Sequence, residues 1–423
     1  MRRVKVRLAA AAVLFAALAI SSPRASPLAA DPFELPAPTG SLPVGTTSWR
    51  VIDPSRSETF AGPGVKREVE VLAWYPAASA GGAVAPYLRG GLFEVQGFAA
   101  LLRGPATAYD HLAAVRTHAH VDAPPAPSPA SFPLLVFSHG YGGFASASTA
   151  LLEDLASHGY AVLHIVHPYE AGAATLGDGR VVSFLDETGA PRQGYRDVIG
   201  EWGAEDATMG LVTKSSGEDE QRRLTRTYLA GLKNTGAALG RWVDDTKLVL
   251  DRIAALPRDS AAGRVAARVD TNRAGILGHS MGGVTAGQFC VEDRRCAAGL
   301  NLDGIPQYGT MIDRPMRRPF LMVYSARPGR LGASDAIYRR AASPYYRVEV
   351  KDTLHLDFCD MNFWGGPLRE RGAFGAIAPA RAAEITREIV REYFDQVLLG
   401  RRSPLLARQS SLPEVTVRSF VNR

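Results

Sequence analysis

The sequence predicts an α/β protein in which helices flank both faces of a mostly parallel central sheet. Short, continuous apolar runs such as 133–138 and 160–166 are typical of strands that are buried on both faces. A helical pattern separates these two runs, and a strand–helix–strand unit with short links implies parallel strands. The 423 residues contain no internal repeat and no second segment with a core of its own. We therefore expect one large domain.

The composition is that of an ordinary globular protein. Hydrophobic residues make up 46% and charged residues 21% of the chain, which excludes a disordered chain and a polytopic membrane protein. The net charge of +6 would suit a nucleic-acid partner, but five cations and no acidic residue lie in the first thirty residues. When those five are subtracted from the 48 basic residues, the remainder exceeds the 42 acidic residues by one. We expect no nucleic-acid partner.

Residues 1–30 predict a secretory signal peptide. Four cations within the first seven residues precede an uncharged apolar run, 8–20, and small residues follow as far as Ala30. The run is shorter than the roughly 20 residues that cross a bilayer as a helix. We expect cleavage near Ala30 and a mature protein that is periplasmic or secreted.

The first half of the chain contains a lead-in, an insert and three predicted strands. We expect residues 31–48, rich in Pro, Gly, Ser and Thr, to be an extended lead-in to a domain at 49–402. An insert near 80–131 is rich in Gly, Ala and Pro and has a helical patch at 91–103. The predicted strands are 67–75, 133–138 and 160–166, and the helix between the last two is 149–158.

The second half begins with a polar insert at 171–220. It contains a hairpin-like stretch with Asp178 and Gly179 at its turn, and excursions of this length usually shape a binding site. A helical period follows over 219–256, an amphipathic helix over 380–399, and a C-terminal tail at 403–423. The predicted strands of this half are 273–277, 297–302, 319–324 and 345–350.

A G-x-S-x-G motif at 278–282 is the strongest chemical signal. It follows the predicted strand 273–277 and opens a helix, which is the strand–turn–helix setting of a nucleophilic serine. The turn is so sharp that the flanking glycines leave no room for a Cβ atom. The Ser280 hydroxyl is thereby expected above the sheet, at the positive end of a helix.

His355 is the expected base that removes the proton of Ser280. In α/β-hydrolases the catalytic residues follow in the order Ser, then Asp or Glu, then His. Eight of the nine histidines, from His111 to His279, precede Ser280, and only His355 follows it. It comes just after the last predicted strand, where a loop can place an imidazole over the edge of the sheet.

The acid that orients His355 has two candidates. Asp303 directly follows the predicted strand 297–302, so its carboxylate is expected at the carboxyl end of the sheet beside Ser280. Asp335 follows the next strand, the more usual place, but lies eleven residues past Tyr324. Asp352 and Asp357 are too close to His355 in sequence to orient it. We favour Asp303, which would hold the imidazole tautomer and stabilise the imidazolium.

Two backbone N–H groups are expected to form an oxyanion hole. One belongs to Met281, directly after the nucleophile, and the other to Tyr141, in the Gly-rich loop after the strand 133–138. His139 in the same loop is expected to be a hydrogen-bonded structural residue, because it precedes Ser280 in the chain.

The cysteines predict no metal site. No Cys/His cluster has the spacing of a zinc site, and we expect no metal and no cofactor. Cys290 and Cys296 are six residues apart and could close a small disulfide loop in an exported protein, with Cys359 left over. The spacing leaves the pairing open.

These residues resemble the α/β-hydrolases of the platelet-activating factor acetylhydrolase family, its plasma and type II members and their bacterial relatives. The resemblance runs from about Leu42 to Leu399 and rests on the blocks LPVGTT, WYPA, PLLVFSHGYGGF, GHSMGG, LNLDG and HLDF. It implies an α/β-hydrolase fold, an acid at Asp303 and a bulky oxyanion residue at Tyr141. The sequence LDGIP replaces the family's LDAW, and the segments 171–220 and 80–105 differ. The resemblance therefore implies the reaction rather than the substrate.

The expected function is that of a metal-independent serine esterase. Its substrate would be a small-molecule or lipid ester with a short or truncated acyl chain, such as an acetylated or oxidised phospholipid, met by transient contact with a lipid surface. The alternatives are a polyester or cutinase-like hydrolase, or a general carboxylesterase, with the same catalytic residues. A non-catalytic exported binding protein would have lost one of these residues, and none is missing.

Overall fold

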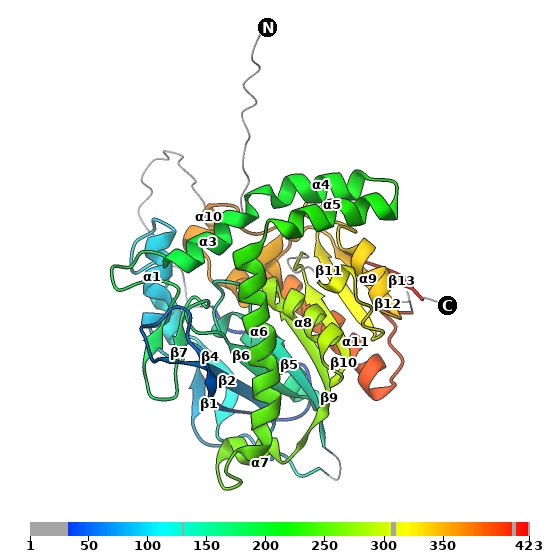
Figure 1. Cartoon of the computed structure of the whole chain (residues 1–423). Coiled ribbons are helices and arrows are strands. Elements are labelled where there is room, and N and C mark those ends of the chain that lie inside the picture. Colours follow the sequence, from blue (N-terminus) through cyan, green and yellow to red (C-terminus); the bar gives the residue numbers. More distant parts are fainter. Residues whose placement is uncertain (1–32, 129–130, 306–309, 408–411, 422–423) are drawn as a thin grey trace.

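The computed structural model describes residues 33–128, 131–305, 310–407 and 412–421, and within them an eleven-stranded sheet forms the centre of the molecule (Figure 1). The strand order is β13-β12-β11-β10-β9-β5-β6-β2-β1-β4-β3. The six neighbours from β12 to β6 run parallel, and β13 and β2 join them antiparallel. The strands are β1 (Val44–Ser57), β2 (Lys66–Pro76), β3 (Val84–Pro86), β4 (Arg116–Val121), β5 (Phe132–Ser138), β6 (Ala161–Val166), β9 (Val269–His279), β10 (Cys296–Leu302), β11 (Phe320–Ser325), β12 (Tyr345–Val350) and β13 (Val415–Phe420).

Helices cover both faces of this sheet, as the sequence predicts. Successive residues of β5 alternate between two apolar cores: Leu134 and Val136 lie in one, Leu135 and Phe137 in the other. Helices α6 and α8 close the first core, and α2 and α11 close the second. The longer helices are α1 (Phe93–Leu101), α2 (Thr149–Ser157), α3 (Gln193–Glu201), α4 (Glu205–Lys214), α5 (Glu218–Ala230), α6 (Lys233–Arg252), α8 (Met281–Glu292) and α11 (Pro379–Leu399). The fold class is confirmed.

The two inserts form separate structures around the sheet. The first contains β3, α1 and β4, and it extends the sheet beyond β1. The second contains the short hairpin of β7 (Ala174–Thr175) and β8 (Val181–Val182), followed by α3 and α4. Helix α4 lies beside α5 at the top of the molecule in Figure 1.

Several elements differ from the sequence expectations, among them the strands β3 and β4 of the first insert, which the sequence did not predict. The helical stretch 219–256 is divided into α5 and α6. Helix α5 ends at Ala230, before Gly231, and the Glu201 carboxylate accepts hydrogen bonds from the backbone N–H groups of Asn234 and Thr235 in the first turn of α6. The first sheet strand, β1, begins inside the expected lead-in. The expected tail contributes the edge strand β13, which pairs with β12 along its whole length.

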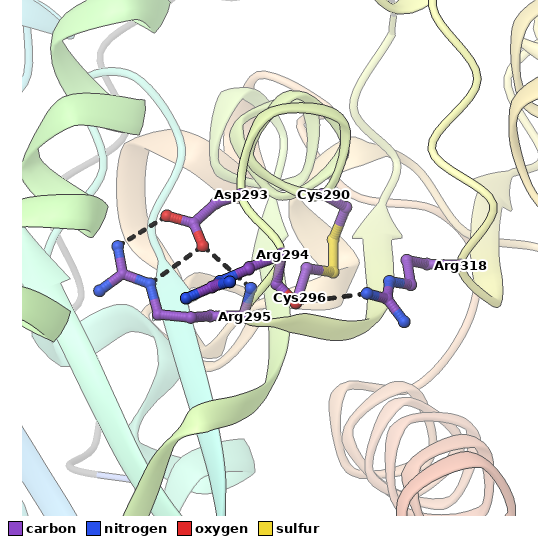
Figure 2. The surroundings of a disulfide bond; sticks show 6 residues. All are labelled: Cys290, Asp293, Arg294, Arg295, Cys296 and Arg318. Carbon is purple, nitrogen blue, oxygen red and sulfur yellow. Dashed lines mark hydrogen bonds and ion pairs between the residues drawn. A yellow bond between two sulfur atoms is a disulfide. The ribbon is translucent and has the colours of Figure 1, made fainter.

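A disulfide joins Cys290, near the end of α8, to Cys296, at the start of β10 (Figure 2). The short loop between them is also held by an ion pair of Arg295 with Asp293, at 2.6 Å. Cys359 is free and buried. The pairing that the spacing left open is therefore Cys290–Cys296.

The expected signal peptide at 1–30 lies outside the described residues. Within the described part of the chain, no helix is long and apolar enough to cross a membrane.

Candidate active site

Ser280 lies in the sharp turn between β9 and α8, with φ 54° and ψ −124°. This backbone conformation is rare for any residue other than glycine and is typical of a strained functional position. Close packing of the neighbouring glycines holds it. A Cβ atom on Gly278 would lie 2.3 Å from the carbonyl carbon of Gly282, and one on Gly282 would lie 2.0 Å from the carbonyl oxygen of Ser138. The motif therefore requires glycine on both sides of Ser280.

Asp303 follows β10 and is bound to His355 at 2.8 Å, from Nδ1 of the imidazole to Oδ2 of the carboxylate. Asp303 is 2% exposed, and the loop after β12 brings His355 to it from 52 residues further along the chain. The carboxylate is an acceptor, so Nδ1 carries the proton and Nε2 keeps its lone pair. This is the tautomer that a general base needs.

Ser280 and His355 line the same pocket but form no hydrogen bond with each other in the described structure. Such contacts are often long in hydrolases without substrate and shorten when substrate binds.

Asp303 accepts hydrogen bonds from other residues besides His355. Ser325, the last residue of β11, donates its backbone N–H to Asp303 Oδ1 at 2.7 Å and its hydroxyl to Oδ2 at 3.0 Å. Arg327, two residues later, donates from Nη2 to the same Oδ2 at 3.2 Å. Burial raises the pKa of Asp303, but the Arg327 charge and the bond from His355 outweigh it, so the pKa lies well below its usual range.

Asp335, the alternative acid, lies apart from this cluster. It begins the short helix α9 (Asp335–Ala341) and accepts bonds from the Tyr345 hydroxyl at 2.9 Å and from Arg347 at 2.5 Å. Asp357 follows His355 closely but accepts backbone bonds from Leu354 and Gly375 instead. Of the weighed carboxylates, Asp303 is the one bonded to His355.

The Gly-rich loop after β5 places the Tyr141 amide beside Ser280. A Cβ on Gly140 would lie 3.0 Å from Ser280 Cβ, so the loop passes directly over the nucleophile. Met281 is the first residue of α8, where helical N–H groups have no partner in the helix. Within the described residues neither the Tyr141 nor the Met281 N–H has an acceptor. Both amides are therefore available to a negative oxygen.

His139 holds the orientation of the peptide that carries the Tyr141 N–H. Its Nδ1 donates to the Gly140 carbonyl at 2.7 Å, and Gly143 N–H donates to the same oxygen at 2.9 Å. Its Nε2 accepts the backbone N–H of His167 at 3.1 Å. Because C=O and N–H point in opposite directions across a trans peptide, fixing the Gly140 oxygen also fixes the Tyr141 N–H. Burial lowers the pKa of His139 to about 3, so the ring is neutral and structural, as expected.

A buried ionic cluster supports this loop from below. Asp245 of α6 accepts from Nδ1 of His167 at 2.9 Å and pairs with Arg67 of β2 at 2.5 Å. All three side chains are at most 1% exposed. His167 also stacks on Trp242 with 3.9 Å between ring centroids. These groups sit behind the oxyanion loop rather than in the pocket.

The pocket above Ser280 encloses about 810 Å³ of empty space, part of it open to solvent. Its walls are mainly apolar and come from the oxyanion loop, the second insert and the segment after β12. Trp202, between α3 and α4, is 4% exposed and packs edge-on against Tyr141 at 5.8 Å. The lining includes Tyr141, Phe144, Ala147, Trp202, Leu356, Cys359 and Met361.

Sequence reasoning missed Trp202 and Arg327. Arg327 follows a parallel strand at the same edge of the sheet as Asp303, so the rule that found the acid could have found the arginine. Trp202 lies in a long insert whose path the sequence pattern did not predict. In the part of the chain that the structure describes, no group of three or more His, Cys, Asp or Glu side chains could hold a metal ion.

The fold and this arrangement define an α/β-hydrolase with a serine at the nucleophile position. Comparison with known proteins identifies its relatives. The sequence model of the platelet-activating factor acetylhydrolase, isoform II, family matches residues 74–188, which include the oxyanion loop. Platelet-activating factor acetylhydrolases from Cavia porcellus and Canis lupus familiaris are 26% and 25% identical over 244 and 243 residues, or 56% of this chain and 50% of each relative. The chain spans about half the length of these curated relatives.

A solved structure covers more of the chain. A ferulic acid esterase from Streptomyces cinnamoneus superposes with a TM-score of 0.68 and 28% identity, over 91% of this chain and 99% of the esterase. Together these matches confirm the resemblance found in the sequence. The chain is an α/β-hydrolase that is similar in sequence to the platelet-activating factor acetylhydrolases.

Proposed function

We propose that this chain is a serine esterase that forms an acyl-enzyme on Ser280. The observation that carries the proposal is the strained Ser280 in one pocket with a His355 whose proton is held on Nδ1 by the buried Asp303. The names of the relatives and of the structural neighbour, acetylhydrolase and esterase, support ester hydrolysis.

The proposed reaction has two steps. Ser280 Oγ attacks the ester carbonyl while its proton passes to His355 Nε2, and the new oxyanion accepts bonds from the Tyr141 and Met281 N–H groups. The carbonyl reforms, the alcohol leaves with the proton from His355, and the acyl group remains on Ser280. A water molecule then repeats the attack, releasing the carboxylic acid and restoring the hydroxyl. Asp303 stabilises the imidazolium that forms in both steps.

The proposed substrate is a lipid or small-molecule ester with a short or truncated acyl chain. The mainly apolar pocket and the acetylhydrolase relatives support this class. An ester of a phenolic cinnamate-type acid is a second candidate, since Trp202 and Tyr141 offer aromatic surfaces and the structural neighbour is a ferulic acid esterase. A polyester is the third candidate substrate.

We also propose that the enzyme works after export, outside the cytoplasm, and meets lipid substrates by transient surface contact. The disulfide Cys290–Cys296 supports an oxidising compartment.

A fluorophosphonate probe tests the nucleophile. We expect the wild-type chain to be labelled and to hydrolyse p-nitrophenyl acetate, and Ser280→Ala to do neither while unfolding at an unchanged temperature. Labelling of Ser280→Ala at the wild-type rate would contradict the proposal. Turnover of a short sn-2 phospholipid, a methyl hydroxycinnamate and a soluble polyester then separates the three substrate classes.

A further inference from the structure

Arg327 places a permanent positive charge beside the carboxylate of Asp303, the acid of the proposed active site. The Asp303 Oδ2 atom accepts three hydrogen bonds, from His355 at 2.8 Å, from the Ser325 hydroxyl at 3.0 Å and from Arg327 at 3.2 Å. The imidazole of His355 and the guanidinium of Arg327 therefore donate to the same oxygen of one carboxylate. The Arg327 side chain is 22% exposed and lines the pocket together with His355.

This arrangement changes the electrostatics of a serine–histidine–aspartate site. A lone carboxylate offers a full negative charge to the imidazolium that forms during attack. Here the carboxylate is already paired with a guanidinium that does not lose its proton. The Asp303–Arg327 pair is neutral overall, so a proton on His355 gains less from it than from Asp303 alone.

The Arg327 guanidinium is directed toward Asp303 through Nη2, and the side chain also lines the pocket. Its Nε is fully buried without a hydrogen-bond partner, and Nη2 faces Asp303. The pocket wall around it is otherwise mostly apolar. The guanidinium of Arg327 therefore acts on the Asp303 carboxylate.

We propose that Arg327 is a positioning residue that acts through Asp303 and extends the working range of His355 to lower pH. The inference rests on the proposed function of this site. It assigns to Arg327 the task of keeping His355 Nε2 unprotonated, and therefore able to accept the Ser280 proton, in mildly acidic surroundings.

Few other charged or titratable groups face His355. The His279 ring lies 4.6 Å from the His355 ring, and its Nε2 donates to the His355 carbonyl at 2.8 Å. Burial lowers the pKa of His279 to about 3, so this ring stays neutral. Asp357 is held by backbone N–H groups, and burial raises the pKa of the Cys359 thiol. Asp303, which binds His355, and Arg327, which binds Asp303, are therefore the charged groups of this cluster.

The test compares the pH dependence of kcat/KM in the full-length enzyme with neutral p-nitrophenyl acetate. In Arg327→Gln, an amide can still donate to Asp303 but the charge is gone. We expect the midpoint of the acidic limb to move up by about one pH unit, as for removal of one nearby charge. Arg327→Lys should keep the midpoint within about 0.3 unit of wild type.

Two controls separate charge from structure. Ser325→Ala removes a neutral donor to the same oxygen and should move the midpoint less than Arg327→Gln does. Arg401→Gln removes an exposed charge at the end of α11 and should move nothing. Thermal unfolding of every variant reports folding, and Arg327→Met is a second neutral variant if Arg327→Gln does not fold.

The His355 imidazole signal in NMR gives a readout that needs no substrate, assigned by its loss in His355→Asn. Its titration should shift with Arg327→Gln as the acidic limb does. An unchanged or lowered midpoint in both measurements would overturn the inference, as would an effect confined to KM. If the wild-type enzyme hydrolyses no ester, the proposed function fails, while the NMR titration still decides the role of Arg327.

Discussion

Ser280 illustrates how a single residue can be held in an unfavourable conformation by its surroundings. A non-glycine residue at this φ and ψ costs on the order of 1–3 kcal/mol. The cost is met because the loop after β5, the start of α8 and Gly304 all pack against the turn without side chains. A Cβ on Gly304 would lie 2.0 Å from the Ser280 carbonyl oxygen. The LDGIP sequence thus suits this turn, where the alanine of an LDAW pattern would require a shift.

Asp303 is the residue whose replacement best tests the choice of acid. Asp303→Asn keeps the size of the side chain but no longer holds the His355 tautomer, so we expect kcat to fall by about 10⁴. Asp335→Asn, bonded to Tyr345 and Arg347 instead, should keep kcat/KM within about threefold of wild type. Steady-state hydrolysis of p-nitrophenyl acetate measures both. A comparable loss in Asp335→Asn would reverse the assignment.

At the scale of elements, the second insert forms part of the pocket wall. Trp202 is anchored there by a hydrogen bond from Nε1 to the Thr235 hydroxyl at 3.0 Å. Glu201 accepts from both the N–H and the hydroxyl of Thr235, so these bonds link the end of α3 to the start of α6. The indole is thereby held by Thr235 on one side and by Tyr141 of the pocket on another.

Shortening Trp202 should widen the range of acyl chains. In Trp202→Leu, space opens beside Tyr141, so we expect the ratio of kcat/KM for p-nitrophenyl butyrate to that for the acetate to rise by about fivefold or more, as for a few added methylenes. Trp49→Leu, which shortens a buried tryptophan of the same core away from the pocket, is the matched control and should leave the ratio unchanged. An equal rise in both variants would indicate that either substitution loosens the core in general and that Trp202 does not limit the length of the acyl chain.

At the scale of the whole molecule, the oxidation state of the cysteines provides a test of the proposed export. The Cys290–Cys296 bond joins α8, the helix that follows Ser280, to β10, and Cys359 is free and buried. A disulfide of this kind persists in oxidising surroundings. The thiol content of the purified protein therefore tests the proposed export.

We expect one reactive thiol per denatured chain when the protein is purified from the cells that naturally produce it, and three after reduction. Thiol titration with Ellman's reagent in guanidinium chloride measures this number, with Cys359→Ala as the control that should have none before reduction. Three thiols without reduction would argue against export.

Much of the central sheet could be predicted because its signals are local. Buried parallel strands are continuous apolar runs, and the G-x-S-x-G motif needs only five consecutive residues. The strands β1 and β13 were missed because neither is a continuous apolar run. β1 lies inside the sheet between β2 and β4 but mixes polar with apolar residues, and the edge strand β13 has no buried residue. The break at Gly231 was missed because a helical period continues on both sides of it.

The sequence by itself determined the α/β class and selected Ser280 and His355 as the candidate nucleophile and base, because chain order leaves only His355 after Ser280. Tertiary structure decided which carboxylate meets that histidine, which cysteines pair and which side chains form the pocket. It also brought Arg327 to Asp303 and Trp202 to Tyr141. These contacts join residues from different strands and inserts. The distances between these residues depend on the order of the strands in the sheet and on the paths of the loops that connect them, and no local pattern of residues encodes either.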